Sequence, residues 1–432
     1  MSELQSRLVE KKYLLTFILI TSLFALWGFA NDITNPMVAA FQTVMELSAA
    51  KASLVQFAFY GGYATMAIPA ALFAKRFSYK KSILLGLILY AIGAFMFIPA
   101  ANRQEFSFFC ISLYVLTFGL AFLETTANPY ILSLGSKETS TRRLNLSQAF
   151  NPIGSLMGML VASKIVLAKL ESDTAHVREI GFSNLDEATK ITIREHDLDI
   201  IRNPYVALGC VVLLVFIIIA IFVKNERKDT TTNVNTDNKG TLKRLLSNKI
   251  YREGVITQLF YVAAQIMTWT FIIQYADRLG IDKATAQIYN IIAMVMFLCG
   301  RFISTFLMKY INSRKLLMYF AIGAMLAAAG TILIDGILGL YCLMAISIFM
   351  SLMFPTIYGI ALENVSTEDS TLGAAFLVMA IVGGALMPPL QGMIIDLGTV
   401  ASLPAVNFSF ILPFICFLVI FVYGYRTSKE TK

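Results

Sequence analysis

The sequence has little charge and little that could bind a metal. Charged side chains make up 14% of the 432 residues, against about 25% in an ordinary soluble domain, and 57% are hydrophobic. A soluble globular composition is therefore excluded. The five cysteines and two histidines form no CxxC motif and no Cys/His cluster, which argues against a disulfide framework and a zinc site. We expect no metal and no cofactor.

The sequence is instead rich in long apolar runs. Twelve runs, each at least as long as the ~20 residues that a bilayer requires, are separated by polar turns. They cover approximately 13–43, 50–75, 80–100, 106–134, 143–168, 204–224, 251–277, 284–309, 315–334, 337–362, 370–396 and 403–425. The first run is too long for the core of a signal peptide, so we expect it to be retained. The sequence thus predicts an all-α membrane protein with twelve transmembrane helices.

A polar segment, 224–249, divides the chain into two six-helix halves, 1–223 and 250–432. It is rich in Thr and Asn, the composition of a solvated linker. Lys and Arg gather in the short loops on the side of this linker, as they do on the cytoplasmic side of membrane proteins. This asymmetry predicts a cytoplasmic linker and cytoplasmic termini. It also accounts for the net charge of +8 without nucleic acid as a partner.

The two halves resemble each other at a nearly fixed offset. The basic turn AKRFSYKKSILLG (74–86) has a counterpart in MKYINSRKLLMYF (308–320). Further counterparts are Pro129 and Pro355, and the glycine pairs Gly154/Gly158 and Gly383/Gly384. A duplicated six-span unit is the arrangement of transporters whose halves rock about a site near the middle of the membrane.

A second polar segment, 169–203, lies on the predicted external face. Apolar residues among its alternating charges, such as Val177 and Leu198, predict one or two short amphipathic helices. We interpret the segment as a solvated cap. The alternative is a lid that gates the passage of a substrate.

Charged side chains well inside the predicted spans are the main functional candidates. Such a charge costs at least ~2.5–3.5 kcal/mol on insertion scales, so it usually faces a cavity or a partner. Glu124 has apolar residues on both sides, and we predict that it takes up and releases a proton. A structural hydrogen bond, or a permanent pairing with Arg301, is the alternative. Arg301 could lie in the cavity, or its long side chain could extend to the cytoplasmic interface, and the sequence supports both equally. We group it with the gating residues.

Asp32 lies in the polar sequence WGFANDITNP, just before Pro36. Proline interrupts the helical hydrogen bonds, and a polar cluster at such a break can line water but not lipid. We therefore favour a cavity-lining, proton-coupling role for Asp32 over a solvated helix end. In the predicted topology Asp32 lies in the outer half of the membrane and Glu124 in the inner half, which would suit a proton symporter.

Amide and aromatic side chains at helical spacing form a second pattern. In span seven four of them, from Gln258 to Trp269, recur every three or four residues on one face. They suit a sugar, whose hydroxyls need donors and acceptors and whose C–H face packs on rings; amide-mediated helix packing is the alternative. The predicted substrate contacts are Asn31, Asn35, Asn128, Gln148, Asn151, Gln258, Tyr261, Gln265, Trp269, Phe354 and Tyr358.

Opposite charges in equivalent loops suggest a gate. Arg142 and Arg143 follow span four, whereas the counterpart loop after span ten carries Glu363, Glu368 and Asp369. If the halves close on the cytoplasmic side, these charges would meet there. Exposed pairs are individually worth ~0–1 kcal/mol, so only a network of them could bias the closure.

Several stretches resemble one known family. They include LVQFAFYGGY (54–63), LETTANPY (123–130), RLNLSQAFN (143–151), QLFYVAAQIMTW (258–269) and FPTIYGIALEN (354–364). The chain resembles the major facilitator superfamily, and within it the fucose-galactose-glucose/proton symporters, over essentially its whole length. The resemblance implies alternating access and proton-coupled import of a hexose or deoxyhexose, L-fucose first, by a monomer in the bacterial inner membrane.

The resemblance also assigns individual residues. The family's acid in span four falls on Glu124, and its polar sugar-site residues in span five fall on Gln148 and Asn151. The family's second essential acid, in span one, falls on Asn35, with Asp32 one helical turn earlier. Here the sequence departs from the family's pattern, and whether Asp32 replaces that acid from the neighbouring turn stays open.

Other functions remain open at this stage. Phe354 stands where the resemblance leads us to expect a tyrosine, so a glucose or galactose carrier is one alternative. A sodium-coupled sugar carrier and a membrane sugar sensor share most of these features. A drug exporter would favour an apolar cavity over stacked amides. An enzyme would need a catalytic constellation at one membrane face, and the sequence shows none.

Overall fold

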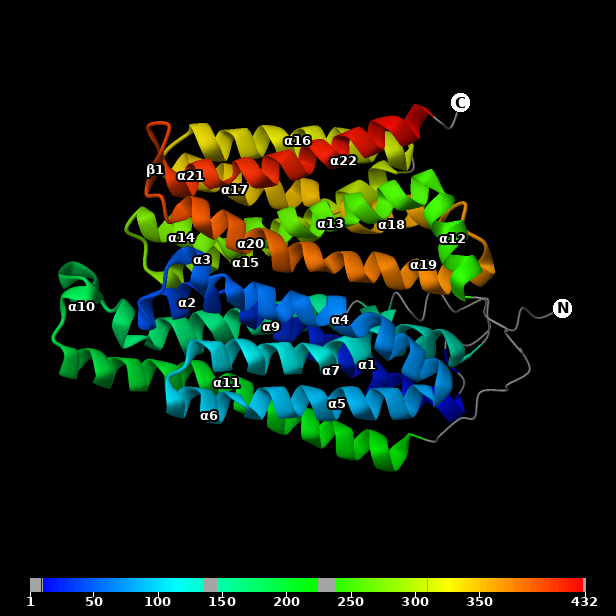
Figure 1. The fold of residues 1–432 in the computed structure, drawn as a ribbon, viewed down its shortest axis with the longest axis horizontal. Coiled ribbons are helices and arrows are strands. Elements are labelled where there is room, and N and C mark those ends of the chain that lie inside the picture. Colours follow the sequence, from blue (N-terminus) through cyan, green and yellow to red (C-terminus); the bar gives the residue numbers. More distant parts are fainter. Residues whose placement is uncertain are drawn as a thin grey trace.

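The apolar runs fold into helices that lie side by side in two groups (Figure 1). This computed structural model describes residue 9 and residues 11–135, 146–148, 150–223, 238–308 and 310–429. The helices up to residue 222 form one group, and those from residue 238 form the other. Both termini lie at the same end of the molecule (Figure 1).

The N-terminal group holds ten α-helices among its described residues. They are α1 (Leu14–Thr34), α2 (Met37–Val44), α3 (Ala49–Ala52), α4 (Leu54–Arg76), α5 (Tyr79–Phe95), α6 (Phe97–Arg103), α7 (Phe106–Ser133), α9 (Phe150–Val161), α10 (Ala175–Ile180) and α11 (Glu187–Phe222). Short 3-10 or π-helical turns are η1 (Lys11–Tyr13), η2 (Ala162–Val166), η3 (Leu167–Lys169), η4 (Glu171–Asp173) and η5 (Phe182–Asn184).

The C-terminal group is built in the same way. Its helices are α12 (Asn238–Ser247), α13 (Lys249–Thr270), α14 (Ile272–Arg278), α15 (Lys283–Leu307), α16 (Ser313–Leu333), α17 (Ile337–Met350), α18 (Met353–Leu362), α19 (Thr367–Met379), η6 (Ala380–Val382), α20 (Gly383–Ile395), α21 (Ala405–Ser409) and α22 (Ile411–Lys429). A two-residue hairpin of β1 (Thr399–Val400) and antiparallel β2 (Leu403–Pro404) precedes α21.

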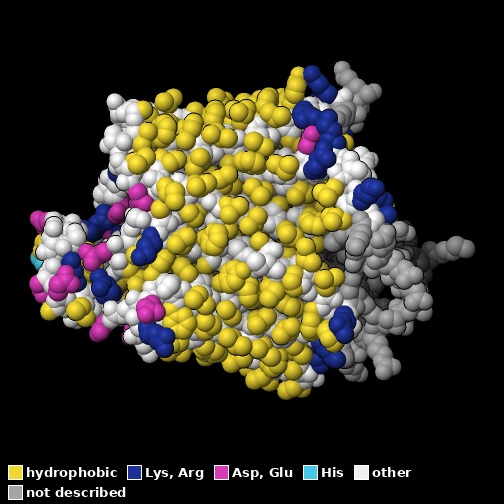
Figure 2. All heavy atoms as spheres, viewed as in Figure 1, with side chains coloured by type: hydrophobic (Ala, Val, Ile, Leu, Met, Phe, Trp, Pro, Cys, Tyr) yellow, Lys and Arg dark blue, Asp and Glu magenta, His cyan; other side chains and the backbone are white. Residues whose placement is uncertain are grey.

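The surface of the bundle is suited to lipid. Within the described residues, twelve helical segments are long and apolar enough to cross a membrane. Large apolar side chains such as Ile221, Phe302 and Leu326 are exposed on them. A hydrophobic band separates two charged ends (Figure 2), and an apolar surface of this extent marks contact with a membrane. The predicted all-α membrane fold with twelve spans is confirmed.

The two ends of the bundle differ. We call the end that carries residues 169–203 the insert end, and the end that carries α12 and both termini the linker end (Figure 1). The insert contains α10 and the start of α11, which continues through Pro204 to Phe222 as one helix. The sixth span therefore begins earlier than the predicted residue 204. Its first turns pack Ile193 with Val177 in a small apolar cluster, so the insert is an ordered part of the bundle.

Part of the predicted linker is helical. Residues 224–237 lie outside the described residues, but the remainder forms α12, which packs against α13 and α19. The division of the chain into 1–223, 224–249 and 250–432 stays a prediction.

The basic turns matched in the sequence begin helices in the same manner. The Ser78 hydroxyl accepts a hydrogen bond from the backbone N–H of Lys81 at the start of α5, and the Asn312 side chain accepts one from Arg314 at the start of α16. Such caps satisfy backbone donors that a helix leaves unpaired.

Close helix packing is also repeated. A Cβ atom on Gly154 of α9 would lie 1.9 Å from the carbonyl oxygen of Ala25 in α1. A Cβ atom on Gly383 of α20 would lie 2.0 Å from that of Leu259 in α13. In each half, therefore, a glycine lets the fifth span approach the backbone of the first.

Several spans are broken within their length. Pro36 separates α1 from α2, Phe271 separates α13 from α14, and Leu352 lies between α17 and α18. Broken backbone at membrane depth is tolerated where it is buried in protein or lines a cavity. These breaks lie beside the cavity described next.

Candidate substrate and proton site between the two halves

A cavity of about 210 Å³ lies between the two halves. The N-terminal group contributes Trp27, Asn31, Asp32, Tyr60, Tyr63, Glu124, Asn151, Pro152 and Ser155 to its lining. The C-terminal group contributes Tyr261, Val262, Gln265, Ile266, Trp269, Met294, Phe297, Leu298, Arg301, Phe354 and Ile381. A space enclosed by both halves is suited to a small polar molecule that must contact both as they move.

Both predicted proton-coupling acids line this cavity. Asp32 lies in the last turn of α1 and is 1% exposed. Glu124 lies on α7, and its Oε2 atom is buried without a hydrogen-bond partner among the described residues. Tyr60 interacts electrostatically with Asp32, and Tyr63, one turn further along α4, with Glu124. Because α4 runs from the insert end to the linker end, the two acids lie at different depths.

Asn35, the position of the family's second acid, lies behind Asp32. Its amide nitrogen donates to Oδ1 of Asp32 at 3.3 Å, and its oxygen accepts from Nε2 of Gln56 at 3.0 Å. Asp32 lines the cavity, whereas Asn35 supports it from the next turn. The structure therefore places the acid, and not the amide, at the cavity wall.

The predicted amide contacts divide into two sets. Asn151 and Gln265 line the cavity. Gln148 donates to Oδ1 of Asn128 at 3.2 Å, away from the lining and toward the linker end. Gln258 is fully buried, and its amide atoms have no hydrogen-bond partner among the described residues. The spacing along span seven thus identified a helix face, but only part of that face reaches the cavity.

Aromatic rings form one wall of the cavity. Trp269 donates from its indole nitrogen to Oγ of Ser347 at 3.1 Å and packs edge-on against Phe297 at 5.2 Å between ring centroids. Tyr261 packs edge-on against Phe354 at 6.0 Å. Such rings offer flat apolar faces to the C–H surface of a ligand. Asn31 completes the predicted contacts that line the cavity and accepts from the Tyr60 hydroxyl at 2.9 Å.

Tyr358 lies one turn beyond the cavity. Its ring stacks on Phe354 at 6.4 Å between centroids, and it interacts electrostatically with Glu124. It therefore connects the cavity with the linker end.

Arg301 lines the cavity from α15. Its Nε atom donates to the backbone oxygen of Ser351 at 3.4 Å, beside the break between α17 and α18, and its guanidinium lies 5.0 Å from the ring centroid of Phe297. The sequence left open whether Arg301 lies in the cavity or reaches the cytoplasmic interface, and in this structure its side chain lines the cavity.

The predicted gate is described only in part. Arg142 and Arg143 lie outside the described residues, as does the side chain of Glu368. Glu363 pairs with Arg314, and Oδ1 of Asp369 lies 2.6 Å from a guanidinium nitrogen of Arg244.

The hydrogen bonds from Arg244 hold the pKa of the Asp369 carboxyl well below its usual value. These described partners belong to α12 and the C-terminal half. The cross-half contact of both acids with Arg142 and Arg143 stays a prediction.

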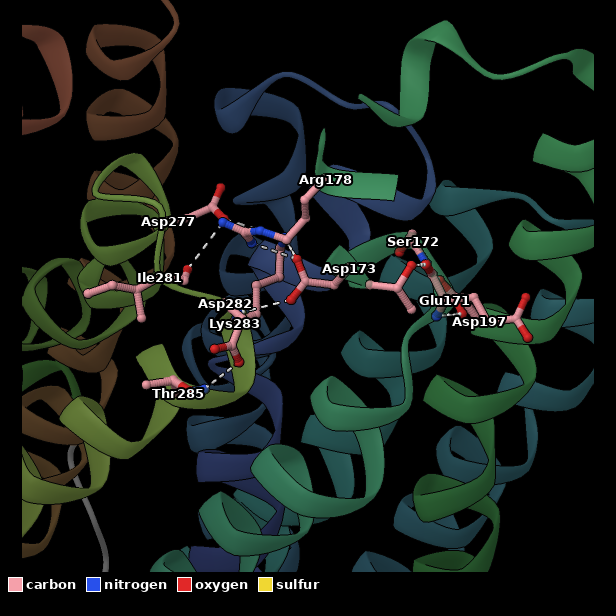
Figure 3. Close-up of polar contacts among 11 residues, drawn as sticks. Glu171, Ser172, Asp173, Arg178, Asp197, Asp277, Ile281, Asp282, Lys283 and Thr285 are labelled. Atoms are coloured by element: carbon pink, nitrogen blue, oxygen red, sulfur yellow. Dashed lines mark hydrogen bonds and ion pairs between the residues drawn. The ribbon is translucent and has the colours of Figure 1, made fainter. Parts of the chain in front are cut away.

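Polar contacts that join the halves gather at the insert end (Figure 3). From the insert, Asp173 lies 2.7 Å from Nζ of Lys283, and Arg178 lies 2.8 Å from Oδ1 of Asp277. Asp197 accepts from the backbone N–H groups of Glu171 and Ser172, and so fixes the turn that carries Asp173. We call Asp173, Arg178, Asp277 and Lys283 the insert-end cluster.

A second contact closes the same end. The Asp396 carboxylate accepts from the backbone N–H groups of Ala49 and Ala50 at 2.7 and 3.0 Å. Together with the insert-end cluster, this contact joins the two halves at the insert end. The insert, predicted to be a solvated cap, takes part in that closure.

Sequence reasoning missed part of the lining. Trp27, Tyr60, Tyr63, Ser155 and Phe297 line the cavity without having been predicted. The two tyrosines are three residues apart in LVQFAFYGGY, and Ser155 follows Asn151 by four residues. A search for polar residues one turn from each candidate would have found Ser155 but not the two tyrosines, because no candidate lies in span two.

Comparison with known proteins agrees with this architecture. A family model for the Major Facilitator Superfamily matches residues 15–388. The chain therefore belongs to the Major Facilitator Superfamily.

Individual relatives are more specific. The L-fucose-proton symporter of Haemophilus influenzae is 62% identical over 99% of this chain and 100% of its own length. The L-fucose-proton symporter of Escherichia coli is 32% identical over 98% and 95%. A glucose/galactose transporter of Brucella abortus is 30% identical over 98% and 96%.

The solved structure of a Major Facilitator Superfamily transporter, FucP, in the outward conformation superposes with a TM-score of 0.71 at 31% identity, covering 96% of this chain and 99% of that one.

Proposed function

We propose that this chain imports L-fucose together with protons by alternating access. The observation that carries the proposal is the cavity, in which two carboxyl groups from one half face aromatic and amide side chains from the other. The 62% identity to an L-fucose-proton symporter over its full length supports the substrate.

Glu124 and Asp32 carry the proton. A carboxyl group without a fixed partner, as at Glu124, can change its protonation state without breaking an ion pair. The proton gradient supplies the energy, and no cofactor takes part. Asn31, Asn151, Gln265 and Trp269 contact the sugar, since donors, acceptors and a flat ring are what its hydroxyls and C–H face need.

The linker end faces the cytoplasm of the bacterial inner membrane, because Lys and Arg concentrate there. The insert end then faces outward and is shut in this structure. Sugar and proton would leave toward the linker end from this state and enter after the insert end has opened. One copy of the chain holds the whole cavity, so a monomer suffices.

The proposal is tested with purified protein in proteoliposomes. Uptake of L-fucose, D-galactose and D-glucose is compared with and without an inward proton gradient, and with sodium replaced. We expect L-fucose to accumulate only when protons flow inward, independently of sodium. If galactose or glucose accumulates instead, the substrate is wrong. If no sugar moves, the function is wrong.

A further inference from the structure

A chain of four buried polar side chains crosses from one half to the other beside the cavity. Asn35 donates to Oδ1 of Asp32 at 3.3 Å and accepts from Nε2 of Gln56 at 3.0 Å. The same nitrogen of Gln56 donates to Oγ1 of Thr270 at 3.0 Å. All four residues are at most 1% exposed. We call them the Asp32–Thr270 chain.

The Asp32–Thr270 chain connects the cavity in the N-terminal half with the break after α13 in the C-terminal half. Asp32 lines the cavity in the N-terminal half. Thr270 is the last residue of α13 in the C-terminal half, directly before the break at Phe271. Gln56 lies in the first turn of α4. The bond between Gln56 and Thr270 spans the two halves, so it must break when they separate at the insert end.

Two of the three hydrogen bonds donate toward Asp32, and the third donates from Gln56 to Thr270. The Asn35 amide gives its N–H to the carboxyl group, which leaves its oxygen to accept from Gln56. The Gln56 nitrogen has two hydrogens, and one goes to Asn35 and the other to Thr270. A hydrogen bond to a charged acceptor is stronger than one to a neutral acceptor, and the bonds from Gln56 to Asn35 and from Asn35 to Asp32 run in series and strengthen each other. The bond from Gln56 to Thr270 is not part of this series; it fixes the position of the Gln56 amide. This arrangement therefore matches an ionised Asp32.

We propose that Gln56 is a positioning residue that couples closure of the insert end to release of the proton from Asp32. Closure brings Thr270 to Gln56, which fixes the Gln56 amide and, through it, the N–H of Asn35 on the carboxylate. Opening removes Thr270, so Gln56 is no longer held and Asp32 retains its proton. The inference rests on the proposed proton symport and assigns its coupling to named bonds.

Other titratable groups face the same cavity. They are Tyr60 and Tyr63 from α4, Glu124 from α7, Tyr261 from α13 and Arg301 from α15. Tyr60 donates to Asn31 and Tyr261 to the backbone oxygen of Met350. Among all these groups, the chain through Gln56 is the hydrogen-bonded connection from Asp32 to the opposite half within the described residues.

The Asp32–Thr270 chain can be tested with a matched set of variants. Thr270→Val removes the acceptor at constant size, and Thr270→Ser keeps it. Thr268→Val is the control, because Thr268 is a buried hydroxyl on the same helix with no partner among the described residues. Gln56→Leu breaks the chain at its centre.

Each variant is reconstituted in proteoliposomes at a fixed external pH and a varied internal pH. Net influx of L-fucose with protons, which requires proton release, is compared with exchange of labelled for unlabelled L-fucose, which does not. We expect Thr270→Val and Gln56→Leu to need an internal pH higher by about half a unit or more for half-maximal influx, a threefold change in proton affinity. Exchange should stay within about twofold of wild type.

Thr270→Ser and Thr268→Val should behave like wild type. If Thr270→Val shifts the profile no more than Thr268→Val while wild type carries L-fucose with protons, the coupling role is wrong. The same holds if Thr270→Val lowers influx and exchange equally, because that is a loss of structure. If wild type moves no protons with the sugar, both this inference and the proposed function fail.

Discussion

The two acids that line the cavity differ in their hydrogen bonds. Asp32 is held by Asn35 and by the chain behind it, whereas the buried oxygen of Glu124 has no hydrogen-bond partner among the described residues. A carboxyl group without a permanent partner is the one whose protonation can change at least structural cost. We therefore expect a change at Glu124 to remove the coupling of transport to the proton gradient.

Glu124→Gln should abolish accumulation and leave exchange. One proton moved across a 100 mV gradient supplies about 2.3 kcal/mol, or roughly a 50-fold accumulation, and without a titratable group the ratio should fall to about one. Uptake driven by a proton gradient and exchange at equal concentrations are measured on the same vesicles. Glu105→Gln, at the exposed start of the same helix, is the control. Accumulation by Glu124→Gln would disprove the assignment.

At this scale the sequence singled out the charged residues of the cavity better than its other contacts. Asp32, Glu124 and Arg301 stand out because charge inside an apolar run is costly. Gln258 carries the same signal as Gln265 but lies outside the lining, and Tyr60 and Tyr63 line the cavity although tyrosine in a membrane helix is not unusual. Which side of a helix faces the cavity depends on how the neighbouring helices pack against it, and a single sequence does not specify that packing.

At the scale of elements, glycine sets how closely helices approach. Gly154 lies against the backbone of α1, while Gly359 on α18 has no other atom within 4 Å of where its Cβ would be. The two glycines have the same intrinsic cost in a helix, so substitution of each separates packing from propensity.

Gly154→Ala should destabilise the protein by about 1–3 kcal/mol, because a side chain there forces two helices apart. Gly359→Ala should be neutral, or stabilising by up to about 1 kcal/mol, because it removes only the conformational freedom of glycine. Thermal unfolding of the detergent-purified variants measures both. Equal effects of the two changes would contradict this account of the packing between α1 and α9.

Element boundaries were predictable where a local signal exists. Pro36 ends α1, and Ser78 and Asn312 begin their helices, as expected for these residue types. The break at Phe271 has no proline or glycine and was not predicted. Nor was the extension of α11 through Pro204, since there the packing of the insert outweighs the local preference.

At the scale of the whole molecule, the insert-end cluster ties the two halves together at one end. The side chains of Asp173 and Lys283 are 4% and 5% exposed, and they come from opposite halves. Neutralising Asp173 leaves Lys283 with only its longer contact to Asp277, at 3.7 Å, so the cost should lie below the about 3–5 kcal/mol of a fully unpaired buried charge. That cost falls on the closed state alone, because both groups become hydrated when the insert end opens.

Asp173→Asn should therefore shift the protein toward the state open at the insert end. A cysteine placed at Gln274, which is buried near this end, should react faster with a membrane-impermeant maleimide when Asp173→Asn is present. Asp199→Asn is the control, since its ion pair with Arg202 stays within α11. If both changes alter the labelling rate equally, the cluster does not hold the insert end shut.

The sequence by itself determined the membrane environment, the number of spans, the two acids Glu124 and Asp32 as buried candidates, and the likeness to a sugar symporter family. These follow from the cost of charge in lipid and from patterns that are local in the chain. Tertiary structure alone decided that Asn35 stands behind Asp32, that Gln56 reaches Thr270, and that the insert takes part in closure. The last two depend on residues far apart in the chain meeting at an interface, and the first depends on which side of α1 faces the cavity; only the packing of the helices specifies either.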